Sequence, residues 1–208
     1  MGELMRAVET AREAQDPYLD GLTFEGETID EGCDLTFFEL HGLELTRCSL
    51  VGANLTKASF YDSTLVECDL TGANLTNAFL ARTRLIDCKL EGAVFTEAIL
   101  RSCRLKGCQC RYVSAGEAKL EGTTLADCDL TEAFLSELKL TRKSRLERCR
   151  LNRADLFRCD LRGVDLTTCD IAGMLTSDDR HELRGAIISL AQAPEVALML
   201  GVRIEGFE

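Results

Sequence analysis

Several features that would indicate catalysis or nucleic-acid binding are scarce or missing in this sequence. Histidine occurs twice, at His41 and His181, and neither lies near residues that could form a catalytic constellation. No glycine-rich phosphate-binding loop is present. Basic side chains number 24 against 35 acidic ones, which gives a net charge of −11. An electrostatic nucleic-acid binder needs a basic surface, so we expect no direct nucleic-acid binding and a protein partner that is basic. Because catalytic constellations are missing, we also expect no enzyme activity.

Long apolar segments are missing as well. No apolar run reaches the roughly 20 residues that a transmembrane helix needs, so we expect no such helix and no membrane partner. The first residues, MGELMRAVETAREAQD, are amphipathic and acidic and do not fit a secretory signal peptide. Leu4, Val8 and Ala11 form one apolar stripe with Met5 beside it, which predicts a helix over residues 2–15 that ends before Pro17.

What the sequence has in abundance is a repeat. From Cys48 to Leu100, a Leu or Phe recurs every five residues, and the whole pattern recurs every 20, as Cys48, Cys68 and Cys88 show. A five-residue period fits neither an α-helix nor an alternating strand. It fits a chain that turns a corner every five residues, so that four corners close one coil.

Each five-residue unit has two apolar or small positions, the central Leu or Phe and the residue two before it. Residues at a spacing of two in an extended segment face the same way, so both positions point inward. The other three positions carry mostly polar side chains or glycine, and we expect them to face solvent or to form the corner.

These units resemble the A(D/N)LXX motif of the pentapeptide-repeat family. ANLTK at Ala53–Lys57, ANLTN at Ala73–Asn77 and ADLFR at Ala154–Arg158 match it closely, and the resemblance covers about three quarters of the chain. It implies an all-β solenoid, a right-handed quadrilateral β-helix. We expect an N-terminal capping helix at 1–16, the β-helix at 17–175 and a small α-containing C-terminal cap at 176–208, because a solenoid must cover its end layers. Docking to a partner is the alternative role for the N-terminal helix.

Eleven cysteines would ordinarily suggest disulfides or a metal site, but their phase in the repeat indicates core positions. Ten occupy the small inward position, and Cys110 occupies a central one. A buried cysteine behaves as a small hydrophobe. Inward positions also account for the tightest group, Cys103, Cys108 and Cys110. We therefore expect no metal, no cofactor and a reducing cytoplasmic location.

Four irregularities interrupt the repeat. One extra residue shifts its phase before Leu35, and a second extra residue within 141–145 predicts a bulged corner. Cys110 and Ala115 stand where leucine is usual, which predicts a thinner core there. The repeat stops after Ile171.

The C-terminal segment is expected to be mixed in structure. Residues 177–183 predict a short helix capped by its Ser-Asp-Asp sequence, and residues 185–188 predict a short strand. A second helix ends at Gly201 and begins at Ser189 or as late as Pro194. The alternation of Val202 and Ile204 predicts a last strand.

Outward positions are the candidates for function. Phe79 and Ile99 are predicted to be exposed and stacked, with Tyr61 nearby, and ordinary surface residues are the alternative interpretation. The face that carries most of the cysteines is rich in carboxylates, and a neighbouring face gathers arginine and lysine. Both histidines are predicted to be solvated, and Phe134 and Phe157 to be isolated outward aromatic residues. The candidate partner surface is Tyr61, Phe79, Ile99, Glu67, Asp69, Asp87 and Glu91; the basic cluster is Arg82, Arg84, Arg104 and Lys106.

Within the family, the chain resembles the Qnr-type and MfpA-type proteins in length, acidity and its C-terminal sequence, with LRGVDL at Leu161–Leu166 and LMLGVRIEG at Leu198–Gly206. Those proteins are rod-like dimers that imitate duplex DNA and bind type II topoisomerases. The resemblance implies binding to DNA gyrase or topoisomerase IV with an effect on quinolone sensitivity. It also implies a homodimer whose interface contains Val196, Leu200, Val202 and Ile204.

Two features depart from that branch. The long loops of Qnr proteins from Gram-negative bacteria are missing, and the basic cluster interrupts a DNA-like charge surface. The alternative function is a structural scaffold with an unrelated protein partner, because a rod can serve many purposes.

Overall fold

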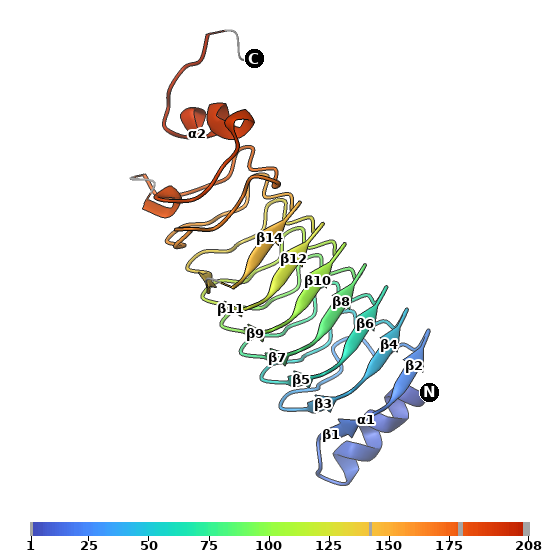
Figure 1. Cartoon of the computed structure of the whole chain (residues 1–208). Helices are drawn as coiled ribbons and strands as arrows, with labels where there is room; N and C mark the ends of the chain where they lie inside the picture. Colours follow the sequence, from blue (N-terminus) through green and yellow to red (C-terminus); the bar gives the residue numbers. More distant parts are fainter. Residues whose placement is uncertain (1, 142, 179–180, 206–208) are drawn as a thin grey trace.

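The chain forms a long four-sided coil with a helix at each end (Figure 1). The computed structural model describes residues 2–141, 143–178 and 181–205. Fourteen short strands make up two sides of the coil in the described residues. They are β1 (Tyr18–Asp20), β2 (Thr23–Glu25), β3 (Glu39–His41), β4 (Glu44–Thr46), β5 (Ser59–Tyr61), β6 (Thr64–Val66), β7 (Phe79–Ala81), β8 (Arg84–Ile86), β9 (Ile99–Arg101), β10 (Arg104–Lys106), β11 (Lys119–Glu121), β12 (Thr124–Ala126), β13 (Lys139–Leu140) and β14 (Arg145–Glu147).

The strands form two parallel seven-stranded sheets, which we name sheet A (β1 to β13, odd numbers) and sheet B (β2 to β14, even numbers). Each strand pairs with the strand one coil away, so that Leu80 lies beside Leu100. The offset between paired residues grows by one for Leu19↔Leu40 and for Leu125↔Leu146. Both predicted one-residue insertions are therefore confirmed, and the register continues past each of them.

Isolated bridges form the other two sides of the coil, which we name side C and side D. Side C carries the bridges that run from Ser49 through Asp69 and Lys89 to Gln109. Side D carries those that run from Asn54 through Asn74 and Val94 to Ser114 and Phe134. Along the chain the order is A, B, C, D, so sheet A lies opposite side C. The predicted right-handed quadrilateral β-helix is confirmed.

The corners need a left-handed backbone at the residue two after each central position. φ is +66° at Gly72, but also +58° at Asn77 and +52° at Glu67. A left-handed conformation costs an ordinary residue about 1–2 kcal/mol. Hydrogen bonds between coils hold these corners, for example from the Asn77 amide to the Thr96 carbonyl at 2.9 Å. Each corner is thus stabilised by its neighbour in the next coil.

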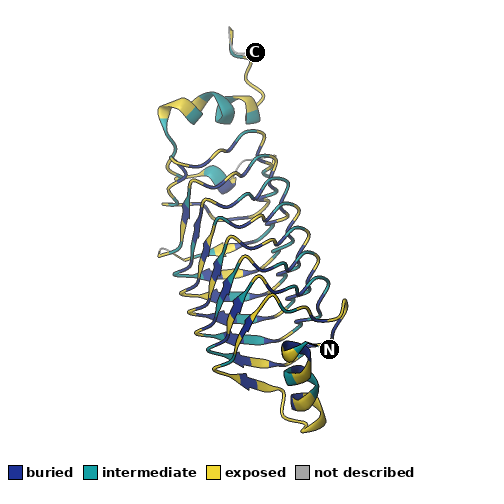
Figure 2. Cartoon of the chain, turned by 90° about the vertical axis from the view of Figure 1, so that its right-hand side faces the viewer, coloured by how far each residue is buried: buried dark blue, intermediate teal, exposed yellow. Residues whose placement is uncertain are grey.

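Columns of inward side chains form one continuous core along the rod (Figure 2). All eleven cysteines are buried free thiols, as predicted. Most of them donate to a carbonyl of the preceding coil, as Cys88 Sγ does to Leu65 O at 3.4 Å. Burial raises the pKa of Cys103 to about 11 and that of Cys159 to about 12, so both thiols are neutral at neutral pH and poor nucleophiles.

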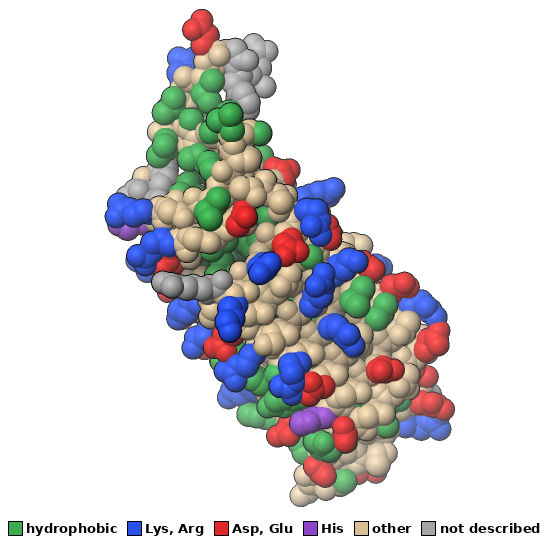
Figure 3. All heavy atoms as spheres, viewed as in Figure 1, with side chains coloured by type: hydrophobic (Ala, Val, Ile, Leu, Met, Phe, Trp, Pro, Cys, Tyr) green, Lys and Arg blue, Asp and Glu red, His purple; other side chains and the backbone are tan. Residues whose placement is uncertain are grey.

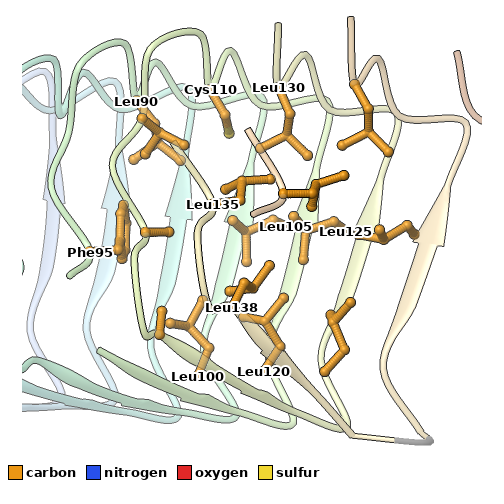
Figure 4. A pocket seen from close by; sticks show the side chains of 17 residues that line it. Leu90, Phe95, Leu100, Leu105, Cys110, Leu120, Leu125, Leu130, Leu135 and Leu138 are labelled. Atoms are coloured by element: carbon orange, nitrogen blue, oxygen red, sulfur yellow. The ribbon is translucent and has the colours of Figure 1, made fainter. Parts of the chain in front are cut away.

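The core is thin in the middle of the rod, as the sequence predicts. A cavity of about 50 Å³ lies among the leucine columns, next to Cys110 and Ala115 (Figure 4). The smaller side chains at these two central positions leave space that leucine fills in other coils.

The N-terminal helix α1 (Glu3–Glu13) covers the first coil. Leu4, Met5, Val8 and Ala11 are buried and belong to the common core, which confirms the predicted apolar stripe and its capping role. Arg12 anchors the helix by donating to the Asp34 carbonyl.

The C-terminal cap differs in part from expectation. It contains the 3₁₀ turns η1 (His181–Leu183) and η2 (Leu190–Gln192) and the helix α2 (Ala193–Met199). The predicted helix over 177–183 is only the turn η1; of its predicted cap, Asp179 lies outside the described residues. The strand predicted over 185–188 is a single bridge, Asp165↔Ile187, and the strand predicted at Val202 and Ile204 is wrong.

Side-chain hydrogen bonds of Gln192 stabilise the 3₁₀ turn η2. The Gln192 amide donates to Leu166 O at 2.8 Å and to Cys169 O at 2.6 Å, while its Oε1 accepts from the Ser189 amide at 2.7 Å. These bonds satisfy carbonyls of the last coils and fix the start of α2. Pro194 then lies in the first turn, where its missing donor costs nothing.

Candidate interaction surfaces

A ladder of aromatic rings crosses four neighbouring strands of sheet A, from β1 to β7. Ring centroids are 5.0 Å apart for Tyr18 and His41, 4.5 Å for His41 and Tyr61, and 5.6 Å for Tyr61 and Phe79. The Arg101 guanidinium lies over the Phe79 ring, 5.3 Å from its centroid. Aromatic pairs at such distances stabilise by about 0.5–1.5 kcal/mol beyond their buried area. Each ring therefore packs against its neighbour and is not free on both faces.

Three expectations for sheet A need correction. Phe79 and Ile99 are directly paired, but both are half-buried and not exposed. The Tyr61 ring and the Arg101 guanidinium lie against the ring of Phe79. His41 was predicted to be solvated, yet its ring lies between two tyrosines and its side chain is 32 % exposed. Its Nε2 lies 3.6 Å from Glu39 Oε2. The signal for this ladder was the recurrence of a ring once per coil, which places Tyr18, His41 and Tyr61 side by side.

The predicted carboxylates lie on and beside side C. Glu67 and Asp87 occupy the same corner, between sheet B and side C, in consecutive coils. Asp69 and Glu91 are half-buried on side C itself. Burial alone would raise the pKa of Asp69, but hydrogen bonds from Thr71 and the charge of Lys89, 3.5 Å away, lower it overall. The Asp69 carboxylate is therefore ionised at neutral pH.

The structure does not bring the candidate residues into one site. Tyr61, Phe79 and Ile99 belong to sheet A, whereas Asp69 and Glu91 lie on the opposite side of the coil. The candidate surface therefore divides into two parts. One is the ladder of aromatic rings with Ile99 on sheet A, and the other is an acidic strip on and beside side C that consists of Glu67, Asp69, Asp87 and Glu91.

A column of glutamates that was not predicted from the sequence runs along another corner of the coil. Glu97, Glu117 and Glu137 follow each other at the corner between side D and sheet A, with φ of +58°, +58° and +61°. Arg158 Nη1 lies 3.2 Å from Glu137 Oε1, but no described Lys or Arg nitrogen lies within 4.0 Å of the carboxylate of Glu97 or Glu117. We name these three residues the acidic column. The recurrence of glutamate at the same corner of successive coils was the signal that could have revealed it.

The C-terminal end exposes apolar side chains. Leu200 is 58 % exposed and Val202 50 %, while Val196 and Ile204 are half-buried. Leu190 is 92 % exposed, and Leu198 lines a groove against Leu175 of the last coil. Four predicted interface residues therefore lie within one short segment, and two of them present free apolar surface.

In the described residues the chain is a four-sided β-solenoid with an apolar core, and most of its polar side chains lie on its outer sides. The model of a pentapeptide repeat region matches residues 38–115, and that of pentapeptide repeats matches residues 108–142 and 142–171. The chain therefore belongs to the pentapeptide-repeat family.

Several solved structures are similar to the chain. HetL, a pentapeptide repeat protein involved in heterocyst differentiation regulation from the cyanobacterium Nostoc sp., is 20 % identical with a TM-score of 0.46, covering 87 % of this chain and 95 % of HetL. Full-length QnrB1, a plasmid-mediated fluoroquinolone resistance protein, is 18 % identical with a TM-score of 0.38, covering 89 % and 100 %. A pentapeptide repeat protein of the Arabidopsis thaliana thylakoid lumen is 22 % identical with a TM-score of 0.26, covering 62 % and 73 %.

The comparison with curated proteins gave no match. In the part of the chain that the structure describes, no helix is both long and apolar enough to cross a membrane.

Proposed function

We propose that this protein is a non-catalytic interaction rod that binds a type II topoisomerase, DNA gyrase or topoisomerase IV, and thereby changes sensitivity to quinolones. Its acidic column and the acidic strip of side C take the place of DNA phosphates in the cationic groove of that enzyme. Membership of the pentapeptide-repeat family supports an interaction role.

The observation that carries this proposal is the acidic column. Glu97, Glu117 and Glu137 hold the same corner position in successive coils, so negative charges repeat about every 4.8 Å along the rod. A DNA strand repeats its charges about every 3.4 Å of helix axis, which is a similar density. The carboxylates of Glu97 and Glu117 are free to accept Lys or Arg from a partner.

The net charge of side C and side D also supports binding to a cationic groove. Residues 88–98, 108–118 and 128–138, which form side C and side D of three coils, contain two basic and six acidic side chains, a net charge of −4. A cationic groove that embraces these sides meets acidic groups over several coils. Electrostatic complementarity of this kind speeds association and selects partners.

Dimerisation through the C-terminal segment is part of the same proposal. Leu200 and Val202 are exposed on a short apolar segment next to α2, and a second copy of that segment would bury them. Two rods joined at this end form a longer acidic surface than one rod alone.

The test is a supercoiling assay of purified gyrase with and without a quinolone, at micromolar concentrations of this protein. The triple variant Glu97→Gln/Glu117→Gln/Glu137→Gln is compared with Glu3→Gln/Glu13→Gln/Glu205→Gln, which loses the same charge elsewhere. We expect the first variant to act about tenfold more weakly and the second to act like wild type. If wild type shows no inhibition, no protection and no binding, the topoisomerase proposal is wrong.

The second candidate is a scaffold that holds an unrelated partner. It is favoured by one observation: several arginines and lysines of the two sheets, such as Arg104 and Lys119, are exposed and have no described carboxylate oxygen within 4.0 Å.

A further inference from the structure

Of the 18 cations that the structure describes in residues 17–175, eight lie within 4.0 Å of a carboxylate of the neighbouring coil, and Arg145 and Arg162 lie within 4.0 Å of one in their own coil. The nitrogen–oxygen distance is 2.6 Å for Arg82–Asp62 and 3.6 Å for Arg150–Asp129. Two others, Lys57 and Arg111, lie over aromatic rings. Pairs of this kind between coils are Arg47–Glu25, Arg82–Asp62, Lys89–Asp69, Arg101–Glu121, Arg148–Asp127, Arg150–Asp129, Arg153–Glu132 and Arg158–Glu137. Twelve of these 18 cations therefore have a carboxylate or an aromatic ring of the same chain as a partner.

Six cations depart from this pattern, and all of them lie on the two adjoining sheets or the bulge between them. Each is exposed, and within the described ranges none has a carboxylate oxygen within 4.0 Å or an aromatic ring beneath it. Figure 3 shows Lys and Arg side chains gathered over the middle of the rod. We name these residues the basic surface: Arg84, Arg104, Lys106, Lys119, Lys139 and Lys143.

Charge separates across these coils in spite of the overall negative charge. Residues 79–87, 99–107, 119–127 and 139–147, which form sheets A and B, contain ten basic and four acidic side chains, a net charge of +6. The whole chain carries −11, so all other residues together carry −11 − 6 = −17. The basic surface is therefore a local feature on an acidic molecule.

The stability of the fold does not require this arrangement. Arg84 pairs with Arg104 on neighbouring strands, and Lys119 pairs with Lys139 in the same way. Like charges directly opposite each other destabilise a sheet. Threonine stands at the equivalent positions of β6 and β12, so the outward position accepts a neutral residue. A bound anionic group would remove the repulsion.

The size of the basic surface favours a short partner segment. It extends over four coils, or about 15 Å at strand spacing. An extended peptide of about five residues has this length. A nucleic acid that continued past the surface would meet coils with a net negative charge, whereas a peptide can place its carboxylates on the surface alone.

We propose that the basic surface binds an extended Asp- and Glu-rich segment of a partner protein. This site is separate from the acidic column and does not depend on topoisomerase binding. A rod with both sites can hold two partners of opposite charge at once.

The test uses the full chain and a fluorescent peptide of about ten alternating Glu and Asp residues, with binding followed by anisotropy at about 50 mM salt. The variant Arg84→Gln/Arg104→Gln/Lys106→Gln is compared with Lys57→Gln/Arg111→Gln/Arg203→Gln, which has the same net charge. We expect about tenfold weaker binding for the first variant and a change below about twofold for the second. Thermal unfolding by circular dichroism checks that both variants fold.

Three results would overturn the proposal. The peptide does not bind to wild type, or both variants weaken binding equally, which would show that only net charge matters. The third is that single-stranded or duplex DNA of equal charge binds more tightly than the peptide and loses its affinity in the first variant, which would make the surface a nucleic-acid site.

Discussion

Filling the cavity in the middle of the rod should stabilise the protein. Ala115 stands at a central position and lines a cavity of about 50 Å³. A core cavity costs about 24 cal/mol for each Å³, so this volume corresponds to about 1.2 kcal/mol. We predict that Ala115→Val raises the free energy of unfolding by about 1 kcal/mol, because its two added methyl carbons enter existing space.

A matched substitution should have the opposite effect. Ala73 is fully buried at a small inward position and does not line the cavity. Ala73→Val adds the same two carbons where no space exists, and overpacking of this kind costs about 1–3 kcal/mol. The two variants therefore separate cavity filling from a general gain in hydrophobicity.

The assay is urea unfolding followed by far-ultraviolet circular dichroism, because the chain contains no tryptophan to report by fluorescence. An increase in the midpoint at unchanged m-value is expected for Ala115→Val. If Ala115→Val lowers the midpoint as Ala73→Val does, the cavity is not available to a side chain and the reasoning fails.

Three further predictions concern other parts of the rod. Arg104→Gln removes the repulsion with Arg84 and should raise the free energy of unfolding by up to about 1 kcal/mol in urea titrations at low salt, a gain that shrinks in high salt. Burial raises the pKa of Glu182, but hydrogen bonds to its carboxylate, including one from the Arg158 amide at 2.7 Å, outweigh this and lower it below 4.5. The ionised carboxylate therefore stabilises the fold above pH 4.5, and this stabilisation is lost as pH falls through the lowered pKa. We expect the free energies of unfolding of wild type and Glu182→Gln, measured by melting at several pH values, to differ by about 2 kcal/mol at pH 7 and to converge in acid. Leu200→Glu should convert a dimer into a monomer in size-exclusion chromatography with light scattering, and an unchanged monomer for both proteins would exclude the C-terminal interface.

The repeat made much of the fold predictable. An inward position at fixed phase predicted the burial of Cys88, the thin core at Ala115 and the continuation of the register past residue 141. The C-terminal cap was less predictable, because it has no repeat. There the side chain of Gln192 captures carbonyls of the preceding coils, a contact that local propensity does not contain.

The outer surface was predictable only in part. The phase identified which residues face outward, but not how they pair with the next coil. Phe79 was expected to be exposed and is half-buried, because Tyr61 and Arg101 lie against its ring. Asp69 and Phe79 were placed on one candidate surface, although the coil sets them on opposite sides.

The sequence by itself determined that this chain coils, since a five-residue period with leucine at its centre leaves no other regular structure that buries those side chains. It also determined which residues fill the core. Only the tertiary structure decided which surface charges are neutralised, because ion pairs such as Arg82–Asp62 form between residues of neighbouring coils that the fold brings to 2.6 Å. The basic surface and the carboxylates of Glu97 and Glu117 are what remains after that pairing, and their arrangement exists only in the stacked coil.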